Sequence, residues 1–307
     1  MLWKGLTGVT MSNPTLAKLL EYLHPKFIGI TIADQKLSAL EPAKGIFFTE
    51  DVSEPTGALH PDSIWKKPVA IQKLVKKAFK AAGVHFWTYQ PVVVFSVPPN
   101  TPPEDNKAIY HQLMTAGAKS VYLLDDLILA ALGSGVYRKD EGPLYHKKIY
   151  VLAQKDATYL GVVLAGGAFE VRTIPKGYAG LTQEELLNEV KNLSANFPRQ
   201  CPAQFQHRAV AKDVAHNLEE AWRRKFESQI YITVPERFKG QWGNTVDDYD
   251  IIYTDQGELA IVKGIEEFFP ALIVKRSPAG RKPMDPVRMV LLLFTVIALM
   301  ILFILKR

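Results

Sequence analysis

The chain has 307 residues, 48% of them hydrophobic, which is enough for one large domain or two of medium size. Its one cysteine, Cys201, excludes an intramolecular disulfide and a zinc cluster built on several cysteines, so we expect a reduced thiol and a cytoplasmic folded part. The formal net charge is +6, and much of the excess flanks an apolar run at the C-terminus. This position favours anionic lipid headgroups over nucleic acid as the partner.

Residues 1–25 are expected to form an N-terminal segment that contains an amphipathic helix. Asn13 and Pro14 supply a helix start, and the leucines of LAKLLEYLH (16–24) lie on one face. This helix either packs on the folded part, which we favour, or makes a second contact with a membrane surface.

Three strands and a helix are predicted next. Residues 26–37 alternate like one strand, and LSALEPAKGIFFTEDV gives two more around a turn at 42–45. A loop over 56–68 leads into a helix over 69–82, which has an apolar stripe with lysines opposite and ends at Gly83. No aromatic or arginine pattern accompanies these lysines, so we expect a solvated face and no nucleic-acid surface.

The stretch from Gln90 to Ile174 predicts the centre of the fold. A buried strand over 91–98 is followed by a helix from Pro103, a strand over 120–124 and an apolar helix after Asp125 and Asp126. A β-meander over 148–174 then begins a second domain on the plan of the first.

The remainder of the chain predicts more α/β structure. A helix over 181–193 has Thr182 as its cap and Glu185 at the capping-box position. Next come a helix over 211–226, strands over 230–235 and 250–254, and a last helix over 257–269. We expect one domain over 26–140, a second over 141–269 and a linker over 270–288.

The C-terminal run MVLLLFTVIALMILFIL (289–305) predicts a single transmembrane helix. It contains no charge, and only Lys306 and Arg307 follow it, so we expect a tail-anchored protein of the cytoplasmic membrane. Arg281, Lys282 and Arg288 on the preceding flank favour a cytoplasmic folded part. The membrane anchor is represented by Met289, Leu291, Phe294, Leu299, Phe303 and Leu305.

The central stretch resembles MreB, the bacterial actin homologue. The resemblance rests on VVVFSVP, on TAGAKSVYLLDDLILAALGSGV and on IYVLAQKDATYLGVVLAGGAFEV, and weaker similarity extends it to about residues 26–269. It implies an α/β, actin-like two-domain fold with a duplicated mixed sheet flanked by helices. The stretches 54–69 and 181–211 are short for the family's outer subdomains, so we expect these subdomains to be reduced.

The resemblance also implies where a nucleotide site lies. In this family two glycine-bearing hairpins hold the phosphates, an acid in each positions Mg²⁺, and a third glycine-rich turn accommodates adenosine. The chain departs from the family at all three elements. The substituted positions are Thr31 and Ala33 in the first hairpin, Leu152, Gln154, Lys155 and Asp156 in the second, and Pro235, Glu236 and Arg237 in the third.

Asp125 and Asp126 match the acidic pair that helps to activate water in this family, although helix capping accounts for them equally well. We therefore expect a pseudo-ATPase with no catalytic residue, no cofactor and no metal. Leu152 and Ile32, on facing hairpins, are expected to fill part of the former cleft.

The leading function is a membrane-anchored scaffold of the bacterial cytoskeleton or cell-shape machinery. Its expected partners are the lipid bilayer, further copies of itself, an MreB-type filament, and cell-wall or shape proteins. One alternative is an adaptor resembling the division protein FtsA or the pilus protein PilM, which binds a partner's peptide. A second alternative is an actin-like enzyme that still binds ATP.

Overall fold

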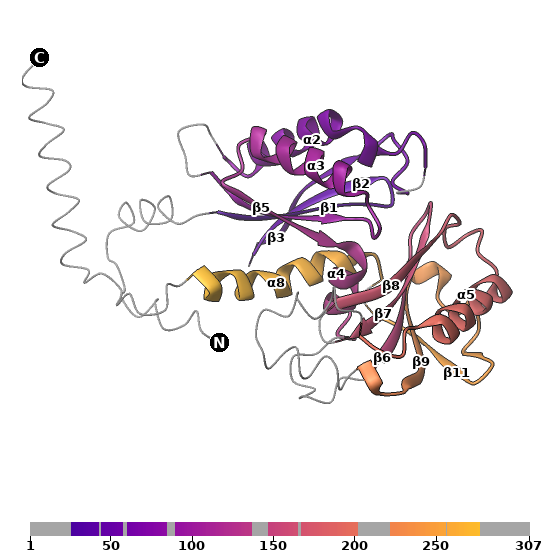
Figure 1. Ribbon diagram of the computed structural model, residues 1–307. Coiled ribbons are helices and arrows are strands. Elements are labelled where there is room, and N and C mark those ends of the chain that lie inside the picture. The colour runs from indigo at the N-terminus through magenta and orange to yellow at the C-terminus, as the bar shows by residue number, and fades with distance from the viewer. Residues whose placement is uncertain are drawn as a thin grey trace, which may run out of the picture. The chain divides into compact units, whose positions relative to one another are not determined.

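The computed structural model describes residues 26–42, 44–57, 60–84, 90–136, 147–164, 167–201, 222–255 and 257–276. The chain divides into two compact units, Met1–Glu267 and Phe268–Arg307, and both sheets belong to the first unit (Figure 1). Within the described ranges, no helix is long and apolar enough to cross a bilayer. The predicted span at 289–305, the N-terminal helix and most of the helix predicted over 211–226 lie outside these ranges.

The first sheet, called sheet A, has the strand order β3-β2-β1-β4-β5. The strands β1, β2 and β3 form an antiparallel meander, whereas β1, β4 and β5 run parallel. The strand bounds are β1 Phe27–Ala33, β2 Lys36–Glu41, β3 Gly45–Asp51, β4 Val92–Val97 and β5 Ser120–Asp125.

The second sheet, called sheet B, repeats this plan with the order β8-β7-β6-β9-β11 and adds β10 at its edge. Here too a meander of three strands is followed by parallel pairs, β6 with β9 and β9 with β11. The strand bounds are β6 Lys147–Ala153, β7 Thr158–Leu164, β8 Gly167–Ile174, β9 Phe226–Thr233, β10 Thr245–Val246 and β11 Tyr249–Tyr253. The expected duplication of a mixed sheet is therefore confirmed.

The described helices agree with most of the sequence predictions. The bounds are η2 Ile64–Lys66, α2 Pro68–Ala81, α3 Pro103–Thr115, α4 Asp126–Gly133, α5 Gln183–Asn196, η3 Glu236–Phe238, η4 Gly257–Leu259 and α8 Ala260–Arg276. The predicted capping box of α5 is present, because Thr182 accepts from the Glu185 N–H and the Glu185 carboxylate accepts from the Thr182 N–H. Gly83 ends α2 at a φ of 67°, a conformation that favours glycine.

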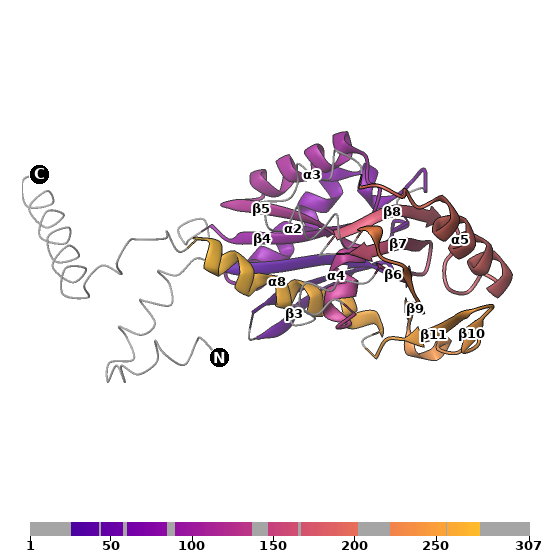
Figure 2. The same ribbon diagram turned by 60° about the horizontal axis from the view of Figure 1, so that its bottom comes forward.

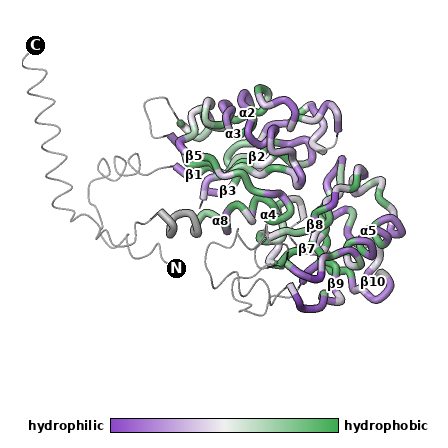
Figure 3. Tube along the Cα trace, viewed as in Figure 1, coloured by the Kyte–Doolittle hydropathy of each residue, from purple (hydrophilic) through white to green (hydrophobic). Residues whose placement is uncertain are grey.

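Each sheet has its own core. On sheet A, Ile30 and Phe95 belong to a cluster with Val75 of α2 and Leu113 of α3. On sheet B, Val151 and Val162 belong to a cluster that includes side chains of α5. Hydrophobic residues concentrate in the strands and in α4, while α2, α3 and α5 mix hydrophobic with hydrophilic residues (Figure 3).

The segment over 26–37 is a hairpin and not the single strand that its alternation predicts. Asp34 and Gln35 have φ values of 50° and 62°, and these left-handed conformations turn the chain between β1 and β2. Aspartate adopts this conformation more readily than most residues. The apolar alternation shifts from even positions through Ile32 to odd positions from Leu37, and an interpretation as one strand overlooks this change of phase.

Two other element bounds differ from the sequence prediction. The strand β9 begins at Phe226, where a helix was expected to end, because Phe226 already pairs with Lys147 of β6. The helix α8 continues through Pro270 to Arg276, where a linker was expected to begin. Proline removes one backbone hydrogen bond from a helix, and here that loss does not end it.

Candidate functional site

The helix α4 is the element that contacts both sheets. It touches β4 and β5 of sheet A, and β6, β7 and β8 of sheet B. It lies beside the first turns of α8 (Figures 1 and 2), and two glycines allow the helix backbones to touch. A Cβ on Gly133 would lie 1.9 Å from the carbonyl oxygen of Ala260, and one on Gly264 would lie 1.8 Å from that of Leu129. These contacts fix α4, and with it Asp126, between the sheets.

The turns of the two equivalent hairpins contact one another directly. The Asp34 carboxylate, in the β1–β2 turn, accepts a hydrogen bond of 2.6 Å from the backbone N–H of Lys155, in the β6–β7 turn. The Lys155 ammonium also donates to the Gln35 side chain. A charged acceptor makes such a bond stronger than one between neutral groups. The backbone N–H of Lys155 is therefore engaged by protein.

A second contact joins the β6–β7 turn to the loop that follows β3. The Asp156 carboxylate accepts from the backbone N–H of Thr56 at 3.1 Å and from its hydroxyl at 3.3 Å. Thr56 is buried, and its carbonyl oxygen accepts from the indole N–H of Trp65 at 2.7 Å. We call the Asp34–Lys155 and Asp156–Thr56 contacts together the hairpin clasp.

The β6–β7 turn is supported from behind by the chain after β8. The N–H of Tyr178 donates to the Gln154 carbonyl oxygen at 3.0 Å, and the Thr158 hydroxyl donates to that of Lys176 at 2.9 Å. A Cβ on Gly177 would lie 1.7 Å from the carbonyl oxygen of Lys155, so only glycine fits there without displacing the turn. The turn is thus held in one position on sheet B.

Beneath the hairpin clasp lies a set of buried polar groups that we call the polar cluster. It consists of Thr31 at the end of β1, Ser96 on β4, Asp126 at the start of α4 and Gln154 after β6. All four are between 0% and 4% exposed. The two hydroxyls, both Asp126 carboxyl oxygens and the Gln154 amide nitrogen have no hydrogen-bond partner among the described residues. Buried polar groups are rarely left in this condition.

The position of the polar cluster follows from strand alternation. Ile30 and Phe95, which pair across β1 and β4, point into the core of sheet A, so the next residues, Thr31 and Ser96, point to the opposite face. Both lie at the carboxyl ends of parallel strands, where ligands of α/β sheets commonly bind. Ser96 and Gln154 lie close to Asp126, and Thr31 neighbours Ser96 on the same face of sheet A.

The pKa of Asp126 is raised to about 7, mainly by burial and also by the nearby charges of Asp125 and Asp34. Ser96 and Gln154 lie close enough to lower this pKa, although neither makes a hydrogen bond of normal geometry. Burial also raises the pKa of Asp125 to about 6. Asp125 is partly exposed and accepts from the N–H of Leu127 at 2.7 Å, which confirms its predicted role as the cap of α4.

Leu152 and Ile32 were both expected in the cleft between the two hairpins, but they lie in different places. Leu152 is 4% exposed on β6, on the strand face opposite Val151 and the core of sheet B. Ile32 is 1% exposed but belongs to the core cluster of sheet A. The expectation that both side chains fill the former cleft is therefore wrong for Ile32, because Thr31 and not Ile32 points to the inner face of β1.

Four hydroxyls near the inner face of sheet B, unlike those of the polar cluster, are paired. The Tyr150 hydroxyl bonds the Ser134 hydroxyl at 3.1 Å and also bonds Thr233, which bonds Thr254 at 2.7 Å. Burial raises the pKa of Tyr150. These hydroxyls satisfy one another, whereas five of the seven buried polar side-chain atoms without a partner in the described residues belong to the polar cluster.

The third predicted element lies apart from the hairpin turns in the topology. Pro235 is buried, and the exposed Glu236 begins η3 directly after β9. Glu236 forms an ion pair with Lys239 at 2.7 Å, and Phe238 of η3 packs on Tyr178 with ring centroids 4.4 Å apart. A short 3₁₀ helix therefore follows β9 at the position where the resemblance implies the family's glycine-rich turn.

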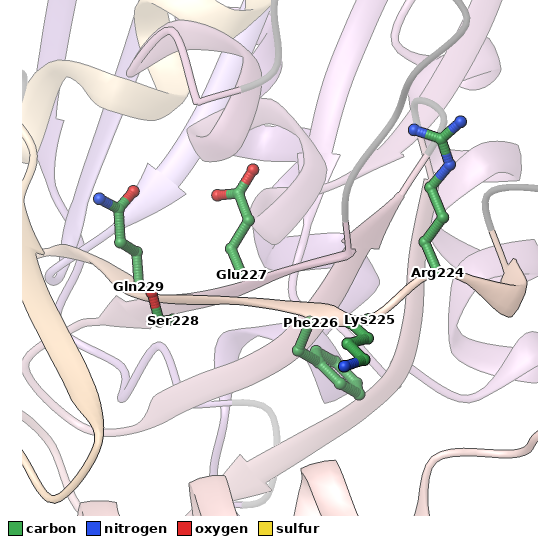
Figure 4. A pocket seen from close by; sticks show the side chains of 6 residues that line it. All are labelled: Arg224, Lys225, Phe226, Glu227, Ser228 and Gln229. Carbon is green, nitrogen blue, oxygen red and sulfur yellow. The ribbon is translucent and has the colours of Figure 1, made fainter.

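A pocket of about 630 Å³ lies along the start of β9 and is lined by residues 224–229 (Figure 4). Its lining is one continuous stretch of chain, so it brings together no groups from different elements. Glu227 and Gln229, which extend to the same side of the strand, both contact the Tyr231 hydroxyl, at 3.0 and 2.7 Å. We do not take this pocket as the functional site.

The clasp and the polar cluster do not fit a phosphate–metal site of the expected kind. The N–H of Lys155 is bound by Asp34, and Leu152, which the resemblance aligns with the family's second acid, is buried. Asp156 is bound by Thr56. Within the described ranges, no group of three or more His, Cys, Asp or Glu side chains is arranged to hold a metal ion.

Comparison with solved structures identifies the fold. Similar structures include MreB 5 of Spiroplasma citri bound to AMPPNP, with a TM-score of 0.54, and the same protein bound to ADP, with a TM-score of 0.53. Both are 12% identical to this chain and cover 82% of it, and the match includes 98% and 99% of their own chains. No protein-family model and no curated protein sequence matches the chain. The fold is actin-like, with two mixed sheets flanked by helices.

Among the predicted site residues, the structure brings Gln154 close to Asp126 and places Thr31 beside Ser96 on the same face of sheet A. It places Ala33 at the end of β1, before the first turn, and Lys155 and Asp156 in the second turn. Sequence reasoning missed the partners of these residues. They are Asp34, Gln35, Thr56 and Ser96.

Proposed function

We propose that this chain is a membrane-anchored, MreB-like pseudo-ATPase that serves as a scaffold of the bacterial cytoskeleton or cell-shape machinery. The observation that carries the proposal is the hairpin clasp, in which Asp34 holds the backbone N–H of Lys155 and Asp156 holds that of Thr56. In the family that the chain resembles, equivalent hairpins face the phosphates of a nucleotide. Here the hairpins face one another.

The chemistry of the substituted positions supports the same proposal. A phosphate needs free backbone N–H groups and small residues that allow close approach. The β6–β7 turn offers Lys155, whose N–H is already bonded, and Leu152, whose apolar side chain is buried at the second acidic position. Protein groups thus hold the two halves of the fold together without a bound nucleotide.

A scaffold role follows from a fold whose contacts do not depend on nucleotide hydrolysis. Actin-like subunits associate head to tail, and such contacts generate open filaments because the same surface is not used by both partners. A nucleotide that is hydrolysed changes a subunit's contacts over time, whereas hydrolysis does not change a subunit closed by its own side chains. Such contacts suit a lasting support at the membrane.

Sedimentation tests the scaffold role. The full chain in detergent micelles is expected to form large assemblies, either alone or together with an MreB-type filament. A chain that stays monomeric and captures a single partner peptide would contradict the scaffold role and support the adaptor alternative.

The membrane anchor is proposed from sequence, because residues 289–305 form an uncharged run long enough to span a bilayer. Deletion of residues 286–307 is expected to release the protein from anionic vesicles in a flotation assay. If the truncated chain still floats with vesicles, the membrane contact lies in the N-terminal segment instead. There, one predicted helix face carries Leu16, Leu19, Leu20 and Leu23.

A further inference from the structure

The polar cluster is the feature of the fold that the proposed function leaves unused. Its four members come from β1, β4, α4 and the β6–β7 turn, and five of their polar atoms have no hydrogen-bond partner among the described residues. Only Asp126 among them carries a titratable group. Its side chain is fully buried, so the ionised carboxylate has a much higher free energy here than the neutral acid.

The surroundings of Asp126 disfavour its ionised form. The charged groups that act on it are Asp125 from the end of β5 and Asp34 from the β1–β2 turn, and both are acids. β4 contributes Ser96 and the β6–β7 turn contributes Gln154, which are neutral. The nearest lysine of the hairpin clasp, Lys155, directs its ammonium to the Gln35 side chain.

The polar cluster is connected to the hairpin clasp through Gln154. The Gln154 side chain is 4% exposed and lies close to Asp126, while its backbone N–H donates to the Ala157 carbonyl oxygen at 2.9 Å. Lys155 and Asp156 lie between Gln154 and Ala157 in the turn, and they make both contacts of the clasp. A displacement of Gln154 therefore moves the residues that join the hairpins.

We propose that Asp126 binds a proton that keeps the hairpin clasp closed, and that loss of this proton opens it. A neutral carboxylic acid has an O–H to donate and an acceptor oxygen, so it suits the hydroxyls and the amide that face it. A carboxylate has no proton to donate, is repelled by Asp34 and Asp125, and draws in water. The inference rests on these contacts alone and does not depend on the scaffold role or the membrane anchor.

The clasp is therefore expected to respond to pH near neutrality, since the pKa of Asp126 is about 7. Below this value the acid is neutral and the hairpins stay joined. Above it the buried charge favours the open arrangement, where water reaches the carboxylate and its pKa returns toward its ordinary value of 3.8. Between pH 5.5 and 7, each pH unit makes the open arrangement about tenfold more favourable.

Hydrogen exchange of the full chain in detergent micelles tests this proposal at the backbone N–H groups of Thr56 and Lys155. After correction for the intrinsic pH dependence of exchange, their protection is expected to fall by about 30-fold between pH 5.5 and 8.5. The N–H of Ala82, bonded within the last turn of α2, serves as an internal reference that stays constant. Equal protection of Thr56 and Lys155 at the two pH values would overturn the proposal.

Two variants assign the effect to Asp126. Asp126→Asn keeps the shape of the neutral acid and is expected to hold the clasp closed at both pH values. In the control Asp125→Asn, asparagine still caps α4, so the transition is expected to persist with its midpoint at lower pH, because a repelling charge is removed. A transition that persists in Asp126→Asn overturns the proposal. If that variant does not fold, an unchanged midpoint in Asp125→Asn overturns it.

Discussion

Replacing Leu152 with aspartate restores the acid of the family's second hairpin, and it is expected to destabilise this chain strongly. Leu152 is 4% exposed and pairs with Tyr159 of β7 and Thr233 of β9. Loss of its burial costs about 1.5–3 kcal/mol. A carboxyl group at this depth adds a further penalty of about 2–3 kcal/mol, even when it takes up a proton. The free energy of unfolding should therefore fall by about 4–6 kcal/mol, a large part of a typical 5–15 kcal/mol.

Urea unfolding of the full chain in micelles, followed by circular dichroism, measures this effect at pH 7. The matched control is Leu152→Met, which preserves volume and apolarity and should cost less than about 1.5 kcal/mol. If Leu152→Asp unfolds within about 1 kcal/mol of the native chain, Leu152 is not packed at the substituted acidic position, and the reasoning is refuted. Equal destabilisation by both variants would also refute it, because polarity would then not be the cause.

Three further predictions concern the contacts between the two halves of the fold. Gly264→Ala should lower the free energy of unfolding by about 2–3 kcal/mol despite the better helix propensity of alanine, because its Cβ would lie 1.8 Å from the Leu129 carbonyl oxygen. The control Gly180→Ala places its Cβ in open space and should be nearly neutral. The reverse ranking in urea unfolding would contradict the close helix contact. Asp156→Ala should cost about 1–3 kcal/mol by leaving the buried Thr56 N–H unpaired, and unchanged exchange of that N–H would show that the bond does not form. Burial raises the pKa of Asp126 from 3.8 to about 7, so the folded state retains a proton that the unfolded state releases. The contribution of Asp126 to stability should be greatest below pH 4, fall by about 4 kcal/mol in total as the pH rises to 7, and level off above that. A free energy of unfolding whose difference from that of Asp126→Asn stays constant over this range would contradict this.

Elements with strong periodicity could be predicted from the sequence. The helix α2, expected over 69–82, is observed at Pro68–Ala81, because its apolar stripe and terminal Gly83 are local signals. The cap of α5 by Thr182 was predictable for the same reason. Local chemistry is enough to place such elements.

The β1–β2 turn is marked in the sequence only by a break in the alternation. Apolar residues lie at even positions through Ile32 and at odd positions from Leu37, so the phase changes across the polar residues 34–36. An interpretation as one continuous strand overlooks this change, and the face of Ile32 was likewise misassigned to the cleft, although Ile32 packs in the core of sheet A. One position along a strand decides which face a side chain occupies.

The hairpin clasp and the polar cluster depend on contacts between residues distant in sequence. Asp34 and Lys155 are 121 positions apart, and their meeting follows from the two facing sheets and not from any local motif. Ser96 is one residue from which the polar cluster could have been predicted, since it is the only polar residue in the strand VVVFSV. A polar residue in a fully buried strand indicates a polar partner nearby.

Calorimetric titration of Mg-ATP into the full chain tests the central claim most directly, since that claim is that the hairpin clasp takes the place of a nucleotide. With the Lys155 N–H bound by Asp34 and Leu152 buried, we expect no binding tighter than a Kd of about 0.1 mM, which corresponds to about −5.5 kcal/mol. Saturable binding tighter than this would contradict the pseudo-ATPase account.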